Sequence, residues 1–202
     1  MPVPQTPGGI AAPPPPAWTA LAPEVKRERI IEAAIAVFAR QGLEAPMHEV
    51  AAAAGAGVAS IYRIFPSKHD LWAAIVIRRL QEMGSAFEQA CERPGTRWDA
   101  LVDVVTRHVA QQSPEPFFME ARAVVEERPE VAAEIARVVA AQGRLLDAAR
   151  AEGRLRSDAT PEDLRLLFAA GRAARRLDPD AVPRMLALMF DALDTRPGSA
   201  DG

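Results

Sequence analysis

Near the amino end, hydroxyl-bearing and basic side chains gather within nine residues. Ser60, Tyr62 and Arg63 are close neighbours, and Lys68 follows five residues later. Such groups contact DNA phosphates, and those that project into a groove can read base edges. We therefore expect these four residues to be DNA contacts. Two simpler interpretations stay open: Tyr62 as a packing residue with an exposed hydroxyl, and Arg63 as part of a solvated helix face.

These side chains belong to a stretch, Glu49 to Lys68, whose pattern predicts two short helices joined by a turn. Its sequence is EVAAAAGAGVASIYRIFPSK. Apolar residues at helical spacing begin at Val50, are interrupted at Gly55 and Gly57, and resume until Pro66, which cannot continue a helix. Glycine tolerates the positive φ of a tight bend. This pattern predicts a helix-turn-helix, whose second helix can enter the DNA major groove.

The rest of the chain predicts further helices and no strand, so the expected fold class is all-α with about nine helices. Pro23 opens the first helix, Gly42 ends it, and Pro46 starts the second. Ser67 and Asp70 have the spacing of a capping box at the start of a long fourth helix.

Helix breakers divide the carboxyl-terminal half. Pro94-Gly95 is the clearest boundary, and Thr160-Pro161 with Asp163 predicts a strong helix start, with threonine as the cap. The other expected helices begin near Thr96, Phe117, Val131 and Asp178.

Composition is that of an ordinary globular protein. The chain has 202 residues, 49% hydrophobic and 25% charged, with a net charge of −3. Residues 24–78 nonetheless hold seven Lys or Arg against six Asp or Glu, a net charge of +1. Cys91 is the only cysteine, which excludes an intrachain disulfide and favours a reducing cytoplasm. No apolar run reaches the length of a transmembrane helix, so no membrane association is expected.

Between Glu24 and Leu80, a spaced set of residues resembles the N-terminal domain of the TetR family of bacterial transcriptional regulators. The matching positions are Arg29-Ile30-Ile31, Ala33-Ala34, Phe38, Gly42, Val50-Ala51, Gly55, Gly57-Val58, Ile61-Tyr62, Phe65, Ser67-Lys68 and Leu71. The resemblance implies that Tyr62 and Lys68 contact the DNA backbone. It also implies that Ser60 takes the place of a common threonine.

Three positions depart from the family's pattern. Met47 stands where threonine is usual at the start of the second helix, Ile64 stands where histidine is common, and Ala59 replaces a frequent glycine. The resemblance makes Met47 a DNA-contact position, but one without the phosphate-facing hydroxyl. We therefore expect modest DNA affinity, or a target read with few direct base contacts.

The resemblance also implies a function. A regulator of this family is expected to bind a palindromic operator in double-stranded DNA as a homodimer, to act as a repressor, and to leave the DNA when a small effector binds. On this interpretation residues 23–70 form the helix-turn-helix domain and residues 71–195 the ligand-binding and dimerisation domain. The proline-rich residues 1–22 and residues 196–202 are expected to be disordered tails.

The same resemblance assigns roles to apolar residues of the second domain. The last two helices are expected to pair with a second copy, although an intramolecular core remains the alternative. The residues concerned are Leu164, Leu167, Phe168, Met185, Leu186, Met189 and Phe190. Aromatic side chains are expected to line an effector cavity, with two polar anchors. These are Phe87, Trp98, Phe117 and Phe168, with His108 and Arg122 as the anchors, and each could instead be a core or surface residue.

Little in the sequence favours an enzyme. His48, His69 and His108 are far apart, and there is no His-Glu-x-x-His helix, cysteine pair or phosphate-binding glycine loop. We therefore predict no catalytic residue, no metal site and no cofactor. Two other interpretations stay open. One is a helical small-molecule-binding protein that no longer reads DNA, which Met47 and Ile64 favour, and the other is a soluble helical enzyme.

Overall fold

A computed structural model describes residues 18–111 and 116–195 of the chain, and within these ranges the expectation of an all-α fold is confirmed. Nine α-helices and two short 3-10 helices account for the regular structure there, beside one isolated antiparallel bridge between Leu155 and Asp194. The helices are α1 (Pro23–Gln41), α2 (Met47–Ala54), α3 (Val58–Ile64), α4 (Lys68–Glu92), α5 (Arg97–Gln111), α6 (Pro116–Val125), α7 (Pro129–Ala151), α8 (Pro161–Leu177) and α9 (Val182–Leu193).

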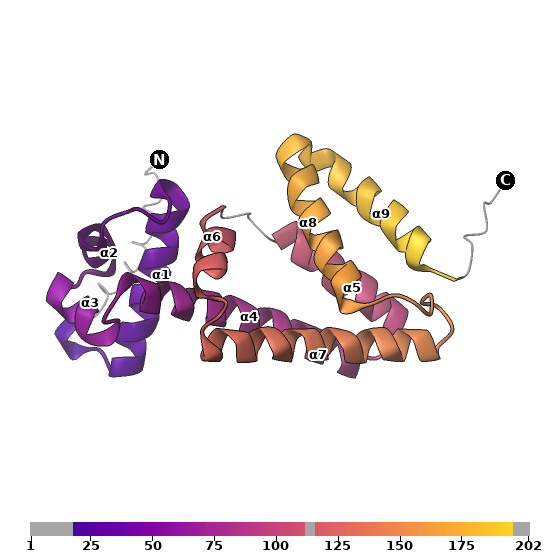
Figure 1. The fold of residues 1–202 in the computed structure, drawn as a ribbon, viewed down its shortest axis with the longest axis horizontal. Helices are drawn as coiled ribbons and strands as arrows, with labels where there is room; N and C mark the ends of the chain where they lie inside the picture. Colours follow the sequence, from indigo (N-terminus) through magenta and orange to yellow (C-terminus); the bar gives the residue numbers. More distant parts are fainter. Residues whose placement is uncertain (1–17, 112–115, 196–202) are drawn as a thin grey trace, which may run out of the picture.

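Helices α1 to α3 form a compact head at one end of the molecule (Figure 1). Gly55 ends α2 in the left-handed region, with φ of 67°, and its N–H donates to the carbonyl of Ala52. The N–H of Ala56 reaches back to the carbonyl of Ala51 at 2.9 Å, which completes a Schellman motif. Gly57 then starts α3. The turn between the two helices is therefore built by the glycines, as the sequence predicts.

The head is held by a small apolar core shared among α1, α2, α3 and the first turns of α4. Ile30, Phe38, Ile61, Phe65 and Leu71 are all almost fully buried in it. Trp18, in the 3-10 helix Trp18–Ala20, packs against the same core. The expected tail at 1–22 is therefore ordered at residues 18–20, and residues 1–17 lie outside the described ranges.

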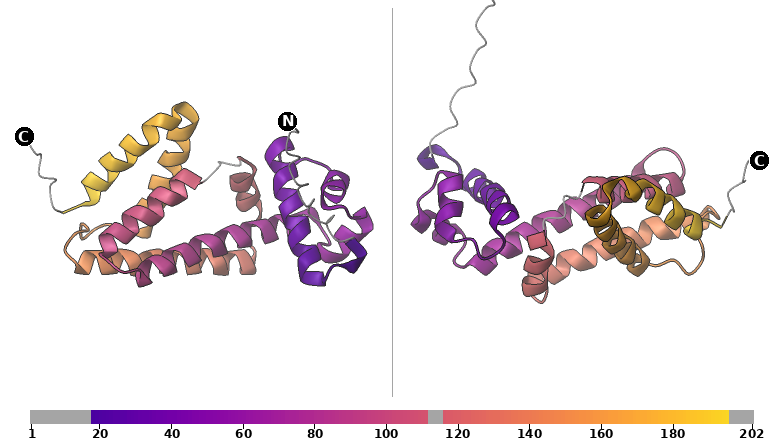
Figure 2. Two further views of the ribbon diagram at one scale, coloured as in Figure 1. Left: turned by 180° about the vertical axis from the view of Figure 1, so that it is seen from behind. Right: turned by 90° about the horizontal axis from the view of Figure 1, so that it is seen from above.

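Helices α4 and α7 lie side by side and run in the same direction, from the head to the far end of the molecule (Figures 1 and 2). Polar contacts connect them along their length. The residue numbers of the partners increase together, as expected for two parallel helices. The pairs are Asp70–Arg128, Gln81–Glu134 and Glu88–Arg137. Together the two helices form a closely packed pair that connects the head to the α8–α9 pair.

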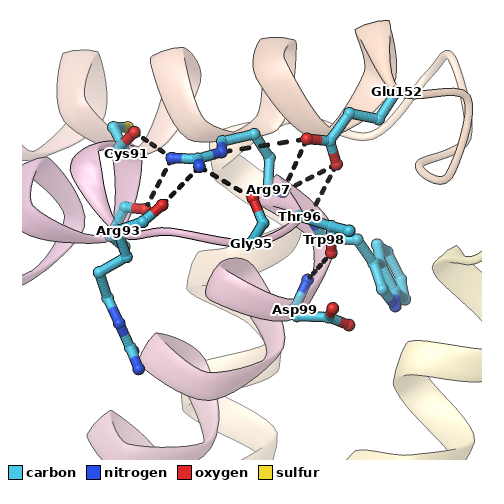
Figure 3. Close-up of polar contacts among 9 residues, drawn as sticks. Cys91, Arg93, Gly95, Thr96, Arg97, Trp98, Asp99 and Glu152 are labelled. Atoms are coloured by element: carbon cyan, nitrogen blue, oxygen red, sulfur yellow. Dashed lines mark hydrogen bonds and ion pairs between the residues drawn. The ribbon is translucent and has the colours of Figure 1, made fainter.

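The α4–α5 turn contains the expected boundary at Pro94-Gly95, and Arg97 organises it (Figure 3). The guanidinium of Arg97 donates to carbonyl oxygens at the end of α4 and in the turn, namely those of Cys91, Arg93 and Gly95. A helix end leaves its last carbonyls without intrahelical partners. Arg97 therefore satisfies acceptors that the helix itself cannot.

Glu152, at the end of α7, caps the start of α5, on the other side of the α4–α5 turn. Its carboxylate accepts from the backbone N–H of Arg97 at 2.8 Å and from that of Trp98 at 3.3 Å (Figure 3). The hydroxyl of Thr96 accepts from the N–H of Asp99 at 3.0 Å, and α5 begins beside this residue, as the sequence predicts. One carboxylate, 55 residues away in sequence, thus connects α5 to α7.

Replacing Glu152 by alanine is expected to lower the free energy of unfolding by about 1–2 kcal/mol, because the first N–H groups of α5 lose an ionised acceptor. Urea denaturation measures the change. The control is Glu127→Ala, which removes an exposed carboxylate in the α6–α7 turn and is expected to change stability by less than about 0.5 kcal/mol. Equal effects for the two variants would contradict the capping role of Glu152.

Candidate DNA interface and ligand cavity

Helix α3 lies on the surface of the head and exposes most of its side chains. Ile61 is its one buried residue, and Val58, Ala59, Tyr62 and Arg63 are exposed. Tyr62 has 44% of its surface exposed and is not part of the head core. The exposed face of α3 therefore combines the apolar Val58 and Ala59 with polar groups from three neighbouring residues.

Those three polar residues are Ser60, Tyr62 and Arg63. A guanidinium nitrogen of Arg63 lies 3.3 Å from the hydroxyl of Ser60, one turn earlier on α3. The structure therefore brings these expected contacts together on one helix. Ile64, where the family often has histidine, is half-buried against the head core.

Met47 occupies a different environment from the other expected DNA contacts. It is the first residue of α2, and its side chain is 7% exposed within the head core. A buried thioether cannot reach a phosphate, so only the backbone at this position could contact DNA. Packing in the head core explains why position 47 has an apolar residue.

Lys68 is the first residue of α4, beside two aromatic rings. Its ammonium lies 5.8 Å from the ring centre of Phe38 and 5.6 Å from that of Trp72. These cation–π contacts hold a half-buried cation at the start of a helix, where backbone N–H groups also favour anions. Lys68 therefore lies in a place suited to a phosphate.

The start of α4 is fixed by the capping box that the sequence predicts. The N–H of Ser67 donates to Asp70 at 2.9 Å, and the N–H of Asp70 donates to the Ser67 hydroxyl at 3.2 Å. Arg128, just before α7, donates to the same carboxylate at 2.8 Å. Hydrogen bonds from Ser67 and Arg128 lower the pKa of Asp70 from its ordinary value. The helix that carries Lys68 is thereby tied to α7.

Arg27 is a residue near this surface that sequence reasoning missed. Its guanidinium lies 4.7 Å from the ring centre of Phe65, immediately after α3. A signal was present, because Lys26 and Arg27 are basic residues near the N-terminus of α1, where the helix dipole disfavours cations. A basic residue at a position where the helix dipole disfavours cations can indicate that an external anion binds there.

A cavity of about 350 Å³ lies between α4, α6, α7 and the start of α8. Apolar side chains form most of its wall, with polar groups from Gln142 and from the ends of α6 and α8. The lining residues are Leu80, Met83, Arg122, Ile135, Val138, Val139, Gln142, Thr160, Pro161, Glu162, Arg165 and Phe168. Its volume is at the lower end of the range for small-molecule sites.

Two of the expected ligand contacts, Arg122 and Phe168, line this cavity. Phe87 packs edge-on against Phe168, with ring centres 6.4 Å apart. Trp98 packs against Phe190 in the core near α9, and Phe117 packs against Phe38 in the head. The structure thus places Phe87, Trp98 and Phe117 outside the lining set, because each fills a core between helices.

His108 packs against Phe168, with ring centres 4.6 Å apart, but is not among the residues that line the cavity. Burial, reinforced by the positive charges of Arg79 and Arg172, lowers the pKa of His108 to about 4. The imidazole is therefore neutral at pH 7. It cannot act as a cationic anchor for a ligand.

Most residues expected at the dimer interface are buried within the chain itself. Leu164, Leu167, Phe168, Leu186 and Phe190 are each at most 7% exposed and belong to the core that α8 and α9 share with α5 and α7. Met185 and Met189 are partly buried against this core. These five residues therefore fit the alternative of an intramolecular core, because they have little surface left for a partner.

The opposite faces of α8 and α9 carry exposed leucines. Leu166 is 53% exposed, Leu177 is 88% exposed and Leu188 is 60% exposed. Alanines at helical spacing accompany them, including Ala173 and Ala192. Figures 1 and 2 show α8 and α9 as a pair at the end of the molecule opposite the head.

The residues that the structure describes, 18–111 and 116–195, provide two further observations. None of the helices in these ranges is both long enough and apolar enough to cross a membrane. Within the same ranges, no three His, Cys, Asp or Glu side chains converge as metal ligands would.

Comparison with known proteins agrees with this arrangement. Residues 30–75 match the family model described as "Bacterial regulatory proteins, tetR family". The HTH-type transcriptional repressor KstR of Mycolicibacterium smegmatis is 30% identical over 141 residues, which is 68% of this chain and 66% of that protein. KstR of Rhodococcus jostii is 30% identical over 148 residues, which is 71% of this chain and again 66% of the relative. The chain therefore spans just under two thirds of either repressor.

Similarity to a solved structure extends further along the chain. The crystal structure of a TetR transcription regulatory protein from Mycobacterium vanbaalenii superposes with a TM-score of 0.62 at 27% identity. That match covers 84% of this chain and 95% of the other. The shared fold therefore includes helices well beyond the head.

Proposed function

Because this chain belongs to the TetR family of bacterial regulatory proteins, we propose that it is a DNA-binding transcriptional repressor that acts as a homodimer. The supporting observation is the exposed α3, which carries Ser60, Tyr62 and Arg63 and is followed after a short turn by Lys68 at the start of α4. The test is selection of operator sequences from random DNA, followed by anisotropy titration. Enrichment of a palindrome supports the proposal, and a pool that stays random contradicts it.

Two residues carry the phosphate contacts in this proposal. Tyr62→Phe and Lys68→Gln are each expected to weaken operator binding about tenfold or more, because each removes a hydrogen bond to a charged oxygen. Arg144→Gln is the control, since it removes an exposed guanidinium on α7. Fluorescence anisotropy measures affinity, and circular dichroism verifies the fold. Unchanged affinity in both head variants would remove Tyr62 and Lys68 from the interface.

The salt dependence of binding should be shallow, because α3 offers few polar side chains and Met47 is buried. We expect log K to fall against log salt with a slope of about −5 or less steep, equivalent to roughly six neutralised phosphates per dimer. A slope near −10 would mean a wider phosphate interface than this head provides. If the slope is shallow, apolar contacts of Val58 and Ala59 with thymine methyl groups are expected to contribute to base selection.

The dimer is proposed to form through the exposed faces of α8 and α9, centred on Leu166, Leu177 and Leu188. Exposed leucines are stabilised when a second copy covers them, and a twofold interface covers the same patch on both copies. Two heads could then contact major grooves one helical turn apart, which a single head cannot do.

The cavity is proposed to bind a small effector that releases the DNA. Helix α6 supports this, because Arg122 lines the cavity while Phe117 of the same helix packs against Phe38 in the head. An effector can shift the protein between states only if it binds one of them better. We further propose a cytoplasmic location and no catalytic role. A small-molecule-binding protein without DNA binding remains the alternative, and failed operator selection would favour it.

A further inference from the structure

The cavity described above has an apolar wall and one cationic corner. Side chains of α4, α7 and α8 provide the apolar part. They are Leu80, Met83, Ile135, Val138, Val139 and Phe168. Gln142 is a buried polar group in the same wall, and its amide nitrogen lies 4.0 Å from the sulfur of Met83, which is a long contact. A ligand here would therefore meet a mainly apolar surface with few polar partners.

Arg122 provides the cationic corner. Its nearest acidic partner is Glu126, at 3.8 Å, and the Glu126 side chain is half exposed to solvent. Arg165, the other lining guanidinium, is already engaged by Glu162 through two contacts, one of them 2.7 Å long. Of the two cations in the wall, Arg122 is thus the one that can accept a new anionic partner.

The surroundings add positive charge to this corner. Arg172 lies four residues after Phe168, on the same side of α8, and is half-buried. Among the described residues, no acidic side chain forms an ion pair with it. Burial, together with repulsion from Arg176 and Arg122, lowers the pKa of Arg172 from its ordinary value. The nearby His108 is neutral at pH 7, so it adds no further positive charge to this corner.

We propose that the cavity binds an apolar molecule that carries one carboxylate, with the carboxylate at Arg122 and the apolar body against α7 and Phe168. A guanidinium fork matches a carboxylate with two parallel hydrogen bonds. One carboxylate suits the site better than a doubly charged phosphate, because Arg165 is neutralised by Glu162. The proposal takes this cavity to be the effector site of the proposed function and adds the chemical class of its ligand.

Three small molecules test the ligand class: octanoate, 1-octanol and octylammonium. They have alkyl tails of similar length and differ in the polar group at the end. Isothermal titration calorimetry with the full-length protein, free of DNA, measures each dissociation constant. Octanoate is expected to bind at least about tenfold more tightly than either other probe, because a hydrogen-bonded ion pair contributes about that factor. Equal or tighter binding of 1-octanol or octylammonium would overturn the proposal, as would no octanoate binding at millimolar concentration.

Variants locate the site. Arg122→Gln should remove the preference for octanoate, whereas Arg107→Gln, an exposed change on α5, should keep it. Val139 lines the cavity and is 46% exposed, so Val139→Trp can fill the space without overpacking a closed core. This variant should weaken octanoate binding at least about tenfold. Unchanged octanoate binding in Arg122→Gln or in Val139→Trp would place the carboxylate elsewhere and overturn the proposal.

Operator release is measured separately, by adding octanoate to the protein–DNA complex. Selective octanoate binding without release would leave the ligand class standing and contradict the effector role. If octanoate did not bind more tightly than 1-octanol and octylammonium, the proposed ligand class would be contradicted, whether or not the DNA is released.

Discussion

Leu188→Asp is expected to convert the dimer into a monomer and to weaken operator binding on the order of a hundredfold or more. Leu188 is 60% exposed in the protomer, so the substitution does not disturb the core. In the proposed interface, however, an aspartate would be buried without a partner, which is strongly unfavourable. A monomer then binds one half-site and loses the high effective concentration that the second head contributes.

Two measurements decide this prediction. Analytical ultracentrifugation reports the mass in solution, and anisotropy with the selected operator reports affinity. Val124→Asp is the matched control, because Val124 is another exposed apolar residue, 53% exposed, but belongs to α6 and not to the proposed α8–α9 interface. If Leu188→Asp remains a dimer with full affinity, the two copies associate through another surface.

Phe117→Ala is expected to lower the free energy of unfolding by about 3–5 kcal/mol, the usual cost of deleting a buried aromatic ring. Phe117 is 2% exposed, and its ring centre lies 5.9 Å from that of Phe38. The two residues join α6 to the head within one continuous core, which also includes Ala121 and Val125. Removing the ring leaves a cavity at the junction between the head and the ligand-binding helices.

Urea denaturation of the full chain measures the loss, with Met119→Ala as the comparison on the same helix. Met119 is 41% exposed, so its truncation is expected to change stability by less than about 0.5 kcal/mol. A small effect at Phe117 would show that it is loosely packed. It would favour the ligand-contact role that sequence reasoning assigned to it.

The sequence by itself determined the helices and their ends. The glycine turn at Gly55 and the capping boxes at Ser67–Asp70 and Thr160–Asp163 were all readable in advance. Each depends on backbone groups and side chains within about five residues, so the local sequence contains all the partners. Boundaries shifted only slightly, as where the 3-10 helix Pro179–Ala181 precedes α9.

Only the tertiary structure decided which apolar residues line a cavity and which fill a core. Helical periodicity identifies an apolar face, but a helix between two layers has several neighbours and the period does not say which one it meets. Phe117 therefore packs against the head, and Leu164 and Leu186 pack within the protomer. The neutral His108 and the Glu152 cap on α5 likewise depend on charges and contacts contributed by distant segments. Interactions between distant segments cannot be read from spacing, because the path of the chain between them sets the geometry.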